Sequence, residues 1–94
     1  MPKAYIVASI NIIDPDGYQT YLNGAVKVTK AAGGKLLVSG GRTEPIEGKF
    51  HDRIVVIEFE SIDAAREAAA GYSALRAARG TSAPDYDSVI VEGI

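Results

Sequence analysis

Strand-like and helix-like patterns alternate along this 94-residue chain, and their order is the feature that most restricts its fold. Short apolar runs, most of them with the repeat of two that is typical of strands, cover residues 4–12, 35–39, 52–60 and 85–91. Helical spacing or alanine-rich composition marks residues 15–32 and 62–79. This order predicts one α+β domain spanning residues 1–94, with ferredoxin-like βαββαβ topology. We therefore expect a four-stranded antiparallel sheet with two helices on one face.

Short signals mark the ends of the helices. Asp14 is an N-cap candidate because its carboxylate can accept from the free amides of the first turn, and Pro15 suits the first helical position. Ser61 is the matching N-cap candidate of the second helix. Gly33 is placed to end the first helix in the left-handed conformation. Gly71 is expected to break or kink the second helix.

Glycines gather in the stretch GGKLLVSGGRTEPIEG, residues 33–48. A phosphate-binding loop needs backbone amides that converge at the start of a helix. Here the first glycine pair follows a helix, and the second leads into a polar connector. This context favours structural roles over nucleotide binding: a helix end, then a bend that carries the chain into an arm. The structural candidates are Gly33, Gly40, Gly41, Glu47 and Gly48.

Composition argues against several classes of protein. A net charge of −2 disfavours nucleic acid and anionic membranes as partners, since both need clustered Lys and Arg. The chain has no cysteine, so disulfides and thiolate chemistry are excluded. A single histidine, His51, excludes a multi-histidine metal site within one chain, and we expect no metal or other cofactor.

RNA-recognition modules share the βαββαβ order and are the main alternative within this topology. They stack bases on aromatic side chains of one strand. When Phe59 is aligned as the last aromatic of that motif, Ile54 and Val56 occupy the positions where the stacking rings belong. The sequence therefore disfavours RNA as a partner.

The apolar run near the start of the chain does not resemble a targeting or membrane-spanning segment. Asn11 interrupts it, Asp14-Pro15 ends it, and it is too short to span a bilayer. We expect a cytoplasmic protein.

One face of the predicted sheet has no helix to cover it. Alternation places Tyr5, Val7, Ile54 and Val56 on that face. An apolar sheet face is about the largest patch that a soluble monomer leaves bare. A twofold partner that packs sheet against sheet would cover it, so we expect a homodimer.

Several short motifs, taken in order, resemble those of a known family. They are DPDGYQTYL with its Asp-x-x-x-Tyr-x-x-Tyr pattern, AAGGKLLVSGGRTEPIEG with its Glu-Gly, DRIVVIEFES with Arg-x-x-x-x-Glu-Phe, YSAL followed by Arg79, and VIVEGI. Together they cover nearly the whole chain, and the sequence resembles the domain of unknown function 1330 family. This resemblance implies a dimeric α/β barrel of ferredoxin-like topology.

The resemblance has one departure and assigns no activity. Members of the family usually have a Trp, another aromatic residue and Ser-Pro-Glu before the Tyr that Tyr72 matches, whereas this chain has EAAAG. A pocket wall made by that aromatic is therefore not expected. Related dimeric barrels include small-molecule monooxygenases, isomerases and decyclising enzymes, but kinship of fold does not transfer function.

Two residues are weak catalytic candidates. His51 could act as a general base because imidazole titrates near neutral pH, or it could be a solvated loop residue. Alternation puts Glu58 on the face that a partner would cover. A buried carboxylate there would serve either as an acid/base group or in an ion pair with Arg53 or Arg79.

The candidate ligand-binding residues are aromatic or basic. Tyr18 and Tyr21 lie three positions apart on the first helix, so they are either core aromatics or the wall of a pocket between helix and sheet. Tyr72 is placed similarly on the second helix. Arginines could hold a carboxylate ligand with two hydrogen bonds, or simply lie on the surface. These arginine candidates are Arg42, Arg53 and Arg79.

Two functional hypotheses remain. The first is a protein that binds or transforms a small organic molecule without a cofactor, with Glu58 as acid/base and the tyrosines and Arg79 as polar elements. Its pocket would lie between the helices and the sheet or inside a dimeric barrel. The alternative is a non-catalytic dimeric binding or regulatory module, in which the same residues form only caps and ion pairs.

Overall fold

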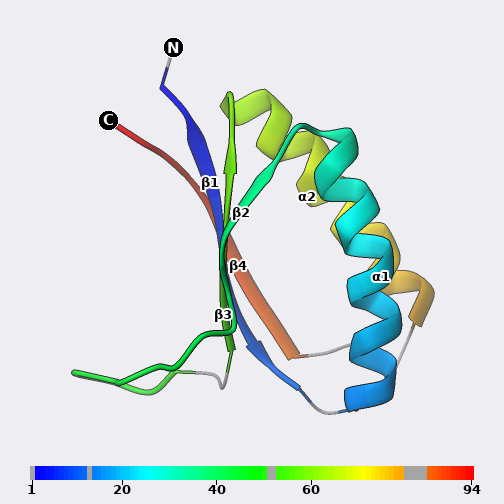
Figure 1. Ribbon diagram of the computed structural model, residues 1–94, viewed down its shortest axis with the longest axis vertical. Helices are drawn as coiled ribbons and strands as arrows, with labels where there is room; N and C mark the ends of the chain where they lie inside the picture. Colours follow the sequence, from blue (N-terminus) through cyan, green and yellow to red (C-terminus); the bar gives the residue numbers. More distant parts are fainter. Residues whose placement is uncertain (1, 13, 51–52, 80–84) are drawn as a thin grey trace.

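The computed structural model describes residues 2–12, 14–50, 53–79 and 85–94, and its elements follow the predicted order (Figure 1). They are β1 (Ala4–Asn11), α1 (Pro15–Ala31), β2 (Lys35–Ser39), β3 (Arg53–Phe59), α2 (Ile62–Arg79) and β4 (Asp85–Glu92). The predicted α+β class and ferredoxin-like βαββαβ topology are confirmed.

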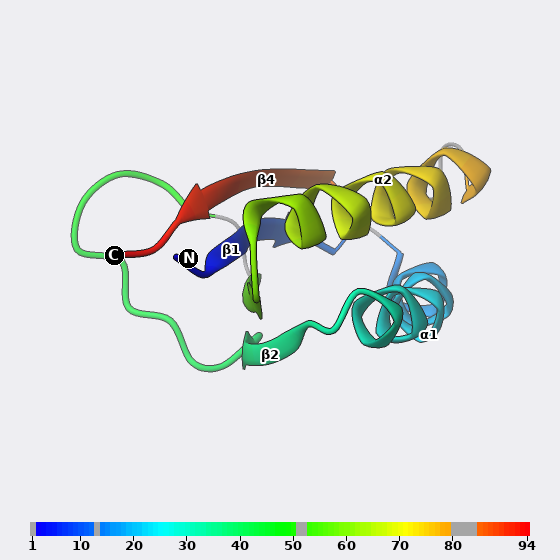
Figure 2. The ribbon, with the colours of Figure 1, turned by 90° about the horizontal axis from the view of Figure 1, so that it is seen from above.

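The strands form one antiparallel sheet in the order β2-β3-β1-β4. Both helices lie on the same side of this sheet, as the view along it shows (Figure 2). The prediction of two helices on one face is therefore confirmed. Central β1 pairs with β3 on one side and with β4 on the other, which places its side chains in the middle of both faces.

The core lies between the sheet and the helices, on the even-numbered side of β1. Ala4, Ile6, Ala8 and Ile10 are all buried there, as the alternation of the sequence predicts. Phe59 of β3, opposite Ala4, is only 1% exposed and is the largest fully buried side chain. Small alanines on the inner side of α2 allow this helix to approach the sheet closely.

The other sheet face, here called the open face, carries the residues predicted for it. The register sets Tyr5 opposite Glu58, Val7 opposite Val56, and Ser9 opposite Ile54. On β4, Val89 and Val91 continue this apolar surface and are 57% and 47% exposed. Neither helix of this chain covers the open face (Figure 1).

The end of α1 is a Schellman motif centred on Gly33. This glycine has φ 72°, and its amide donates to the Lys30 carbonyl at 3.1 Å. The Gly34 amide donates to the Thr29 carbonyl at 2.8 Å, which completes the pattern. The role predicted for Gly33 thus follows from its backbone geometry.

Of the other predictions about the helices, one N-cap is confirmed and the break within α2 is wrong. Ser61 caps α2 as expected, because its hydroxyl accepts from the Ala64 amide at 3.2 Å. Asp14 occupies the N-cap position of α1, but its carboxylate makes no capping hydrogen bond. The expected break at Gly71 is wrong, since α2 continues through it. A Cβ on Gly71 would lie 2.7 Å from Val28 Cγ1, so this glycine serves the close approach of the two helices.

After β2 the chain turns into an arm, residues 41–50, that projects from the end of the sheet on the open-face side (Figure 1). Gly40 makes the turn with φ 68°, and a Cβ there would lie 2.4 Å from Arg53 Cζ. Gly41 has no positive φ, and a Cβ there would meet no described atom. The bend predicted for Gly40 and Gly41 therefore depends on Gly40. Gly48, with φ 78°, turns the chain within the arm.

Neither α1 nor the described part of α2 is long and apolar enough to cross a membrane.

Candidate functional site

A cavity of about 250 Å³, here called the tyrosine pocket, lies between α1 and the covered face of the sheet. α1 packs chiefly against α2 rather than against the strands, which leaves space beneath it on the β2 side. The walls are mainly apolar, with Leu22 and Ala25 from α1 and Val55 and Ile57 from β3. The polar groups come from four tyrosines and a few neighbours: Tyr18, Tyr21, Tyr72, Tyr86, Thr29, Ser39 and Lys30.

The tyrosines are arranged as a contiguous aromatic wall. The ring centroids of Tyr18 and Tyr21 are 6.2 Å apart. Tyr21 also meets the ring of Tyr86 edge to face at 6.2 Å, an arrangement that aromatic pairs favour. Tyr72 reaches the same cavity from α2, so the predicted candidates Tyr18, Tyr21 and Tyr72 do lie together. Tyr86 of β4 was not identified from the sequence.

The hydroxyl of Tyr72 is held by α1. Thr29 donates its hydroxyl proton to the Ala25 carbonyl at 2.9 Å. Since a threonine hydroxyl has one proton, Tyr72 donates to Thr29 in the close contact between their oxygens. The Tyr72 oxygen is left as an acceptor. This pair also ties α2 to α1 beside the pocket.

Arg76, one helical turn after Tyr72, supports the aromatic wall from behind. Its guanidinium donates to the Tyr21 hydroxyl at 3.2 Å and lies 3.9 Å from the ring centroid of Tyr86. It also donates to Ser73 at 3.1 Å. Arg76 was not identified from the sequence. Its four-residue spacing from Tyr72, which puts both on one helix face, was the only available signal.

Burial changes the acidity of three of these phenols. Burial raises the pKa of Tyr21 well above its ordinary value, and the neighbouring Tyr86 adds to the effect while Arg76 opposes it. Burial likewise raises the pKa of Tyr72 and of Tyr86. These hydroxyls are therefore protonated at neutral pH and can act as hydrogen-bond donors and acceptors.

Stability should fall as the pH rises above about 10, where free tyrosine ionises. The unfolded chain then loses protons that buried Tyr21 retains, so ionisation favours the unfolded state. Tyr21→Phe should flatten this decline by up to about 1.4 kcal/mol per pH unit. Urea denaturation between pH 8 and 11.5 measures both slopes. Equal slopes of stability against pH for Tyr21→Phe and the wild type would contradict the raised pKa of Tyr21.

Arg53 lies at the end of the pocket, beside two of its lining residues. Its Cζ is 5.5 Å from the Tyr18 ring centroid, and Nη2 donates to the Ser39 carbonyl and hydroxyl at 3.3 and 3.2 Å. Its Nε is buried and has no hydrogen-bond partner among the described residues. The ion pair considered between Arg53 and Glu58 does not form. The two residues are five positions apart on β3, and side chains an odd number of positions apart in a strand point to opposite faces.

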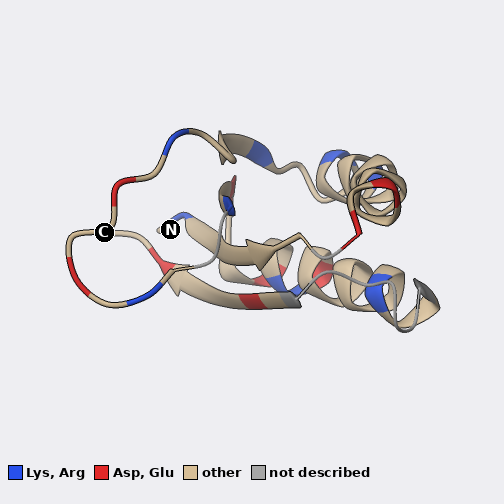
Figure 3. Ribbon diagram, turned by 90° about the horizontal axis from the view of Figure 1, so that it is seen from below, with Lys and Arg blue, Asp and Glu red and all other residues tan. Residues whose placement is uncertain are grey.

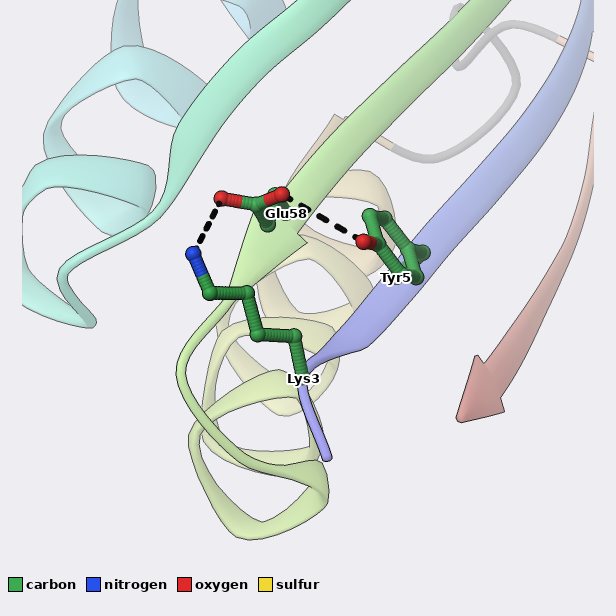
Figure 4. A network of polar contacts seen from close by, with 3 residues as sticks. All are labelled: Lys3, Tyr5 and Glu58. Atoms are coloured by element: carbon green, nitrogen blue, oxygen red, sulfur yellow. Dashed lines mark hydrogen bonds and ion pairs between the residues drawn. The ribbon is translucent and has the colours of Figure 1, made fainter. Parts of the chain in front are cut away.

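Glu58 lies on the open face and not in the tyrosine pocket (Figure 4). It accepts from Lys3 Nζ at 3.2 Å and from the Tyr5 hydroxyl at 3.4 Å. Its hydrogen bond and charge raise the pKa of Lys3. The expectation that Glu58 would act in one pocket with Tyr18, Tyr21 and Tyr72 is therefore wrong, since the sheet separates them.

The other candidates do not reach the tyrosine pocket or lie outside the description. Arg42 pairs with Glu44 at 3.3 Å on the exposed arm. Glu47 is on the same arm, along which Figure 3 shows charges of both signs. His51 and the side chain of Arg79 lie outside the described residues. No cluster of three or more His, Cys, Asp or Glu that could hold a metal is present among the residues described.

The arm and the open face enclose a second, wider hollow of about 910 Å³. Its floor includes Val7, Ile54 and Val89 of the sheet, and its rim includes Ile46 and Phe50 of the arm. Ile46 is 95% exposed, so the arm presents apolar side chains that nothing in the described chain covers. Among the described residues, this hollow is bounded only by the sheet and the arm and is open on its other sides. The tyrosine pocket, in contrast, is lined by residues of both helices and the sheet.

These features define a small ferredoxin-like α+β domain with an aromatic pocket beneath its first helix. The family model described as Domain of unknown function (DUF1330) matches residues 3–94, and the chain belongs to this family. Among curated proteins, none matches the chain.

Two solved structures share the fold. One is the crystal structure of methylated RPA0582 protein, with 17% identity, a TM-score of 0.69, and coverage of 99% of this chain and 82% of that one. The other is RPA0582 itself, a protein of unknown function from Rhodopseudomonas palustris, with 17% identity, a TM-score of 0.64, and coverage of 99% and 83%. At this identity the likeness concerns the fold alone.

Proposed function

We propose that this protein binds a small, largely apolar organic molecule in the tyrosine pocket. The observation that carries the proposal is a cavity with mainly apolar walls that is also lined by four tyrosines, Thr29 and Ser39. This combination is typical of small-molecule sites, which use a few placed polar groups for orientation. The volume of about 250 Å³ is just below the ~300–1,000 Å³ of pockets for drug-sized ligands, so the ligand is small.

Binding is better supported than turnover. The described polar groups that line the pocket are phenols, hydroxyls and one lysine, Lys30, with no carboxylate among them. Because the pKa of Tyr21, of Tyr72 and of Tyr86 is raised, these phenols stay protonated at neutral pH and do not act as general bases. A reaction there would have to use these phenols as hydrogen-bond donors that polarise the ligand. The non-catalytic alternative, a dimeric binding module, needs no such step.

Enlarging Ala25 should block the pocket. This residue lines the cavity from α1, so Ala25→Leu should fill empty space and leave the fold intact. Benzyl alcohol, a neutral probe of suitable size, should bind the wild type in an NMR titration and bind Ala25→Leu at least tenfold more weakly.

The control is Ala70→Leu, which adds the same side chain at an exposed position of α2. It should bind benzyl alcohol like the wild type. Equal affinity for the probe in Ala25→Leu and the wild type would contradict the proposed site.

We also propose that a second copy of the chain covers the open face, giving a homodimer. The support is the contiguous apolar surface of β1, β3 and β4 together with the apolar tip of the arm, since such patches usually mark interfaces. A twofold arrangement would place each arm beside the partner's sheet.

A further inference from the structure

The tyrosine pocket has an unbalanced charge at its rim, and this bears on the class of its ligand. Lys30 of α1 lines the pocket, and Arg53 of β3 touches two lining residues, Tyr18 and Ser39. No Asp or Glu is among the described residues that line the cavity. Ion pairs among the described residues join Lys3 to Glu58, Arg42 to Glu44 and Arg66 to Asp63. Neither Lys30 nor Arg53 has an acidic partner among these residues.

The position of Arg53 makes this lack of a partner costly. Arg53 stands in a row across the covered sheet face, beside Ile10 and, beyond it, Tyr86, and both of these line the pocket. Its guanidinium is partly enclosed by Gly40, Tyr18 and Ser39. A guanidinium carries five N–H donors, and here only Nη2 has acceptors among the described residues. A partly buried charge of this kind is normally paired, because desolvation without a counter-charge is unfavourable.

Building the fold does not require a cation at this position. The other residues of the covered face of β3, Val55, Ile57 and Phe59, are apolar. Gly40 at a positive φ makes room for the Arg53 side chain, since any Cβ there would overlap the guanidinium. Two residues thus combine to place a charge next to an apolar cavity.

We infer that the ligand of the tyrosine pocket is a small organic carboxylate whose anionic group lies at the Arg53 end and whose apolar body occupies the cavity. This inference rests on the proposed function and specifies its ligand class. The planar guanidinium matches a carboxylate, and the Ser39 hydroxyl is a further donor beside it. Lys30 contributes charge at the rim. Tyr72 and Tyr86, which also line the cavity, bind the ligand's remaining polar group or pack on its body.

The test compares benzoate with benzamide, which has the same shape but no charge. In NMR titrations at pH 7, benzoate should bind the wild type roughly 10- to 100-fold more tightly than benzamide, the range of a charge-assisted hydrogen bond. Arg53→Gln should weaken benzoate binding far more than benzamide binding and so remove most of this preference. Arg53→Lys, which keeps the charge without the planar fork, should retain part of it.

The matched control is Arg42→Gln, which removes the same charge from the exposed arm and should retain the full preference for benzoate. Thermal unfolding verifies that Arg53→Gln is folded, with a midpoint expected within roughly 5 °C of the wild type. Should that variant fail to fold, Lys30→Gln removes the other cation beside the pocket, at an exposed position, and should reduce the preference for benzoate by a smaller factor.

The outcomes separate the two proposals. Equal binding of benzoate and benzamide by the wild type would overturn the carboxylate inference and leave the pocket in place. Equal loss of preference in Arg42→Gln and Arg53→Gln would overturn it as well, because net charge alone would then be responsible. If neither probe binds and benzyl alcohol also fails to bind, the proposed function itself is overturned.

Discussion

Val56→Glu should convert the protein from a dimer to a monomer in solution. Val56 lies in the middle of the open face, opposite Val7 on β1 and Val38 on β2. In a twofold interface the substitution buries a carboxylate on each subunit, and an unpaired buried charge costs several kcal/mol. A loss of that size raises the dissociation constant by at least about 100-fold. Sedimentation velocity at micromolar concentration measures the change.

The matched control is Ala70→Glu, which adds one carboxylate on an exposed position of α2 and should remain dimeric. A wild type that sediments as a monomer at the same concentration would contradict the dimer proposal. A dimeric Val56→Glu would show that the interface lies elsewhere.

Phe59→Ala should remove about 3–5 kcal/mol from the free energy of unfolding, the cost typical of deleting a buried aromatic ring. Phe59 is the largest fully buried side chain among the described residues, and its ring leaves no room for a Cβ on Gly34 in the α1–β2 connection. Domains have a total stability of about 5–15 kcal/mol, so the variant should lose a large fraction of its stability. Urea denaturation followed by circular dichroism measures the change.

The chain's only other phenylalanine, Phe50, provides the control. It lies on the arm and is 62% exposed, so Phe50→Ala should change stability by about 0.5 kcal/mol or less. Both variants are best compared in the Val56→Glu background, so that association does not contribute. Similar losses for the two would contradict the assigned core.

The fold was largely predictable because its determinants are local. The even-position alternation of β1 identifies the buried face without knowledge of the partner strands. Gly33 and Ser61 mark helix ends through hydrogen bonds to residues only a few positions away. The break predicted at Gly71 was wrong because it was based on the low helix propensity of glycine. In the structure, glycine is required at this position by the close approach of Val28 from α1. Such a contact between distant segments cannot be identified from a local pattern.

The site was predictable only in part, for the same reason. Helical spacing suggested that Tyr18 and Tyr21 share a face, and both line the pocket. Tyr86 and Arg76 complete the aromatic wall through contacts to Tyr21 from β4 and α2, and their pairing depends on tertiary packing. The grouping of Glu58 with these tyrosines could have been rejected from sequence, because its neighbour Phe59 points to the helices and Glu58 must therefore point away.

The central claim, that the tyrosine pocket is the ligand site, is tested most directly by intermolecular NOEs between benzyl alcohol and methyl-labelled protein. A probe bound in the tyrosine pocket should give NOEs to Leu22, Val55 and Ile57, which line the pocket beneath α1. NOEs confined to Val7, Val56 and Val89 would instead place the probe on the open face and contradict the proposed site.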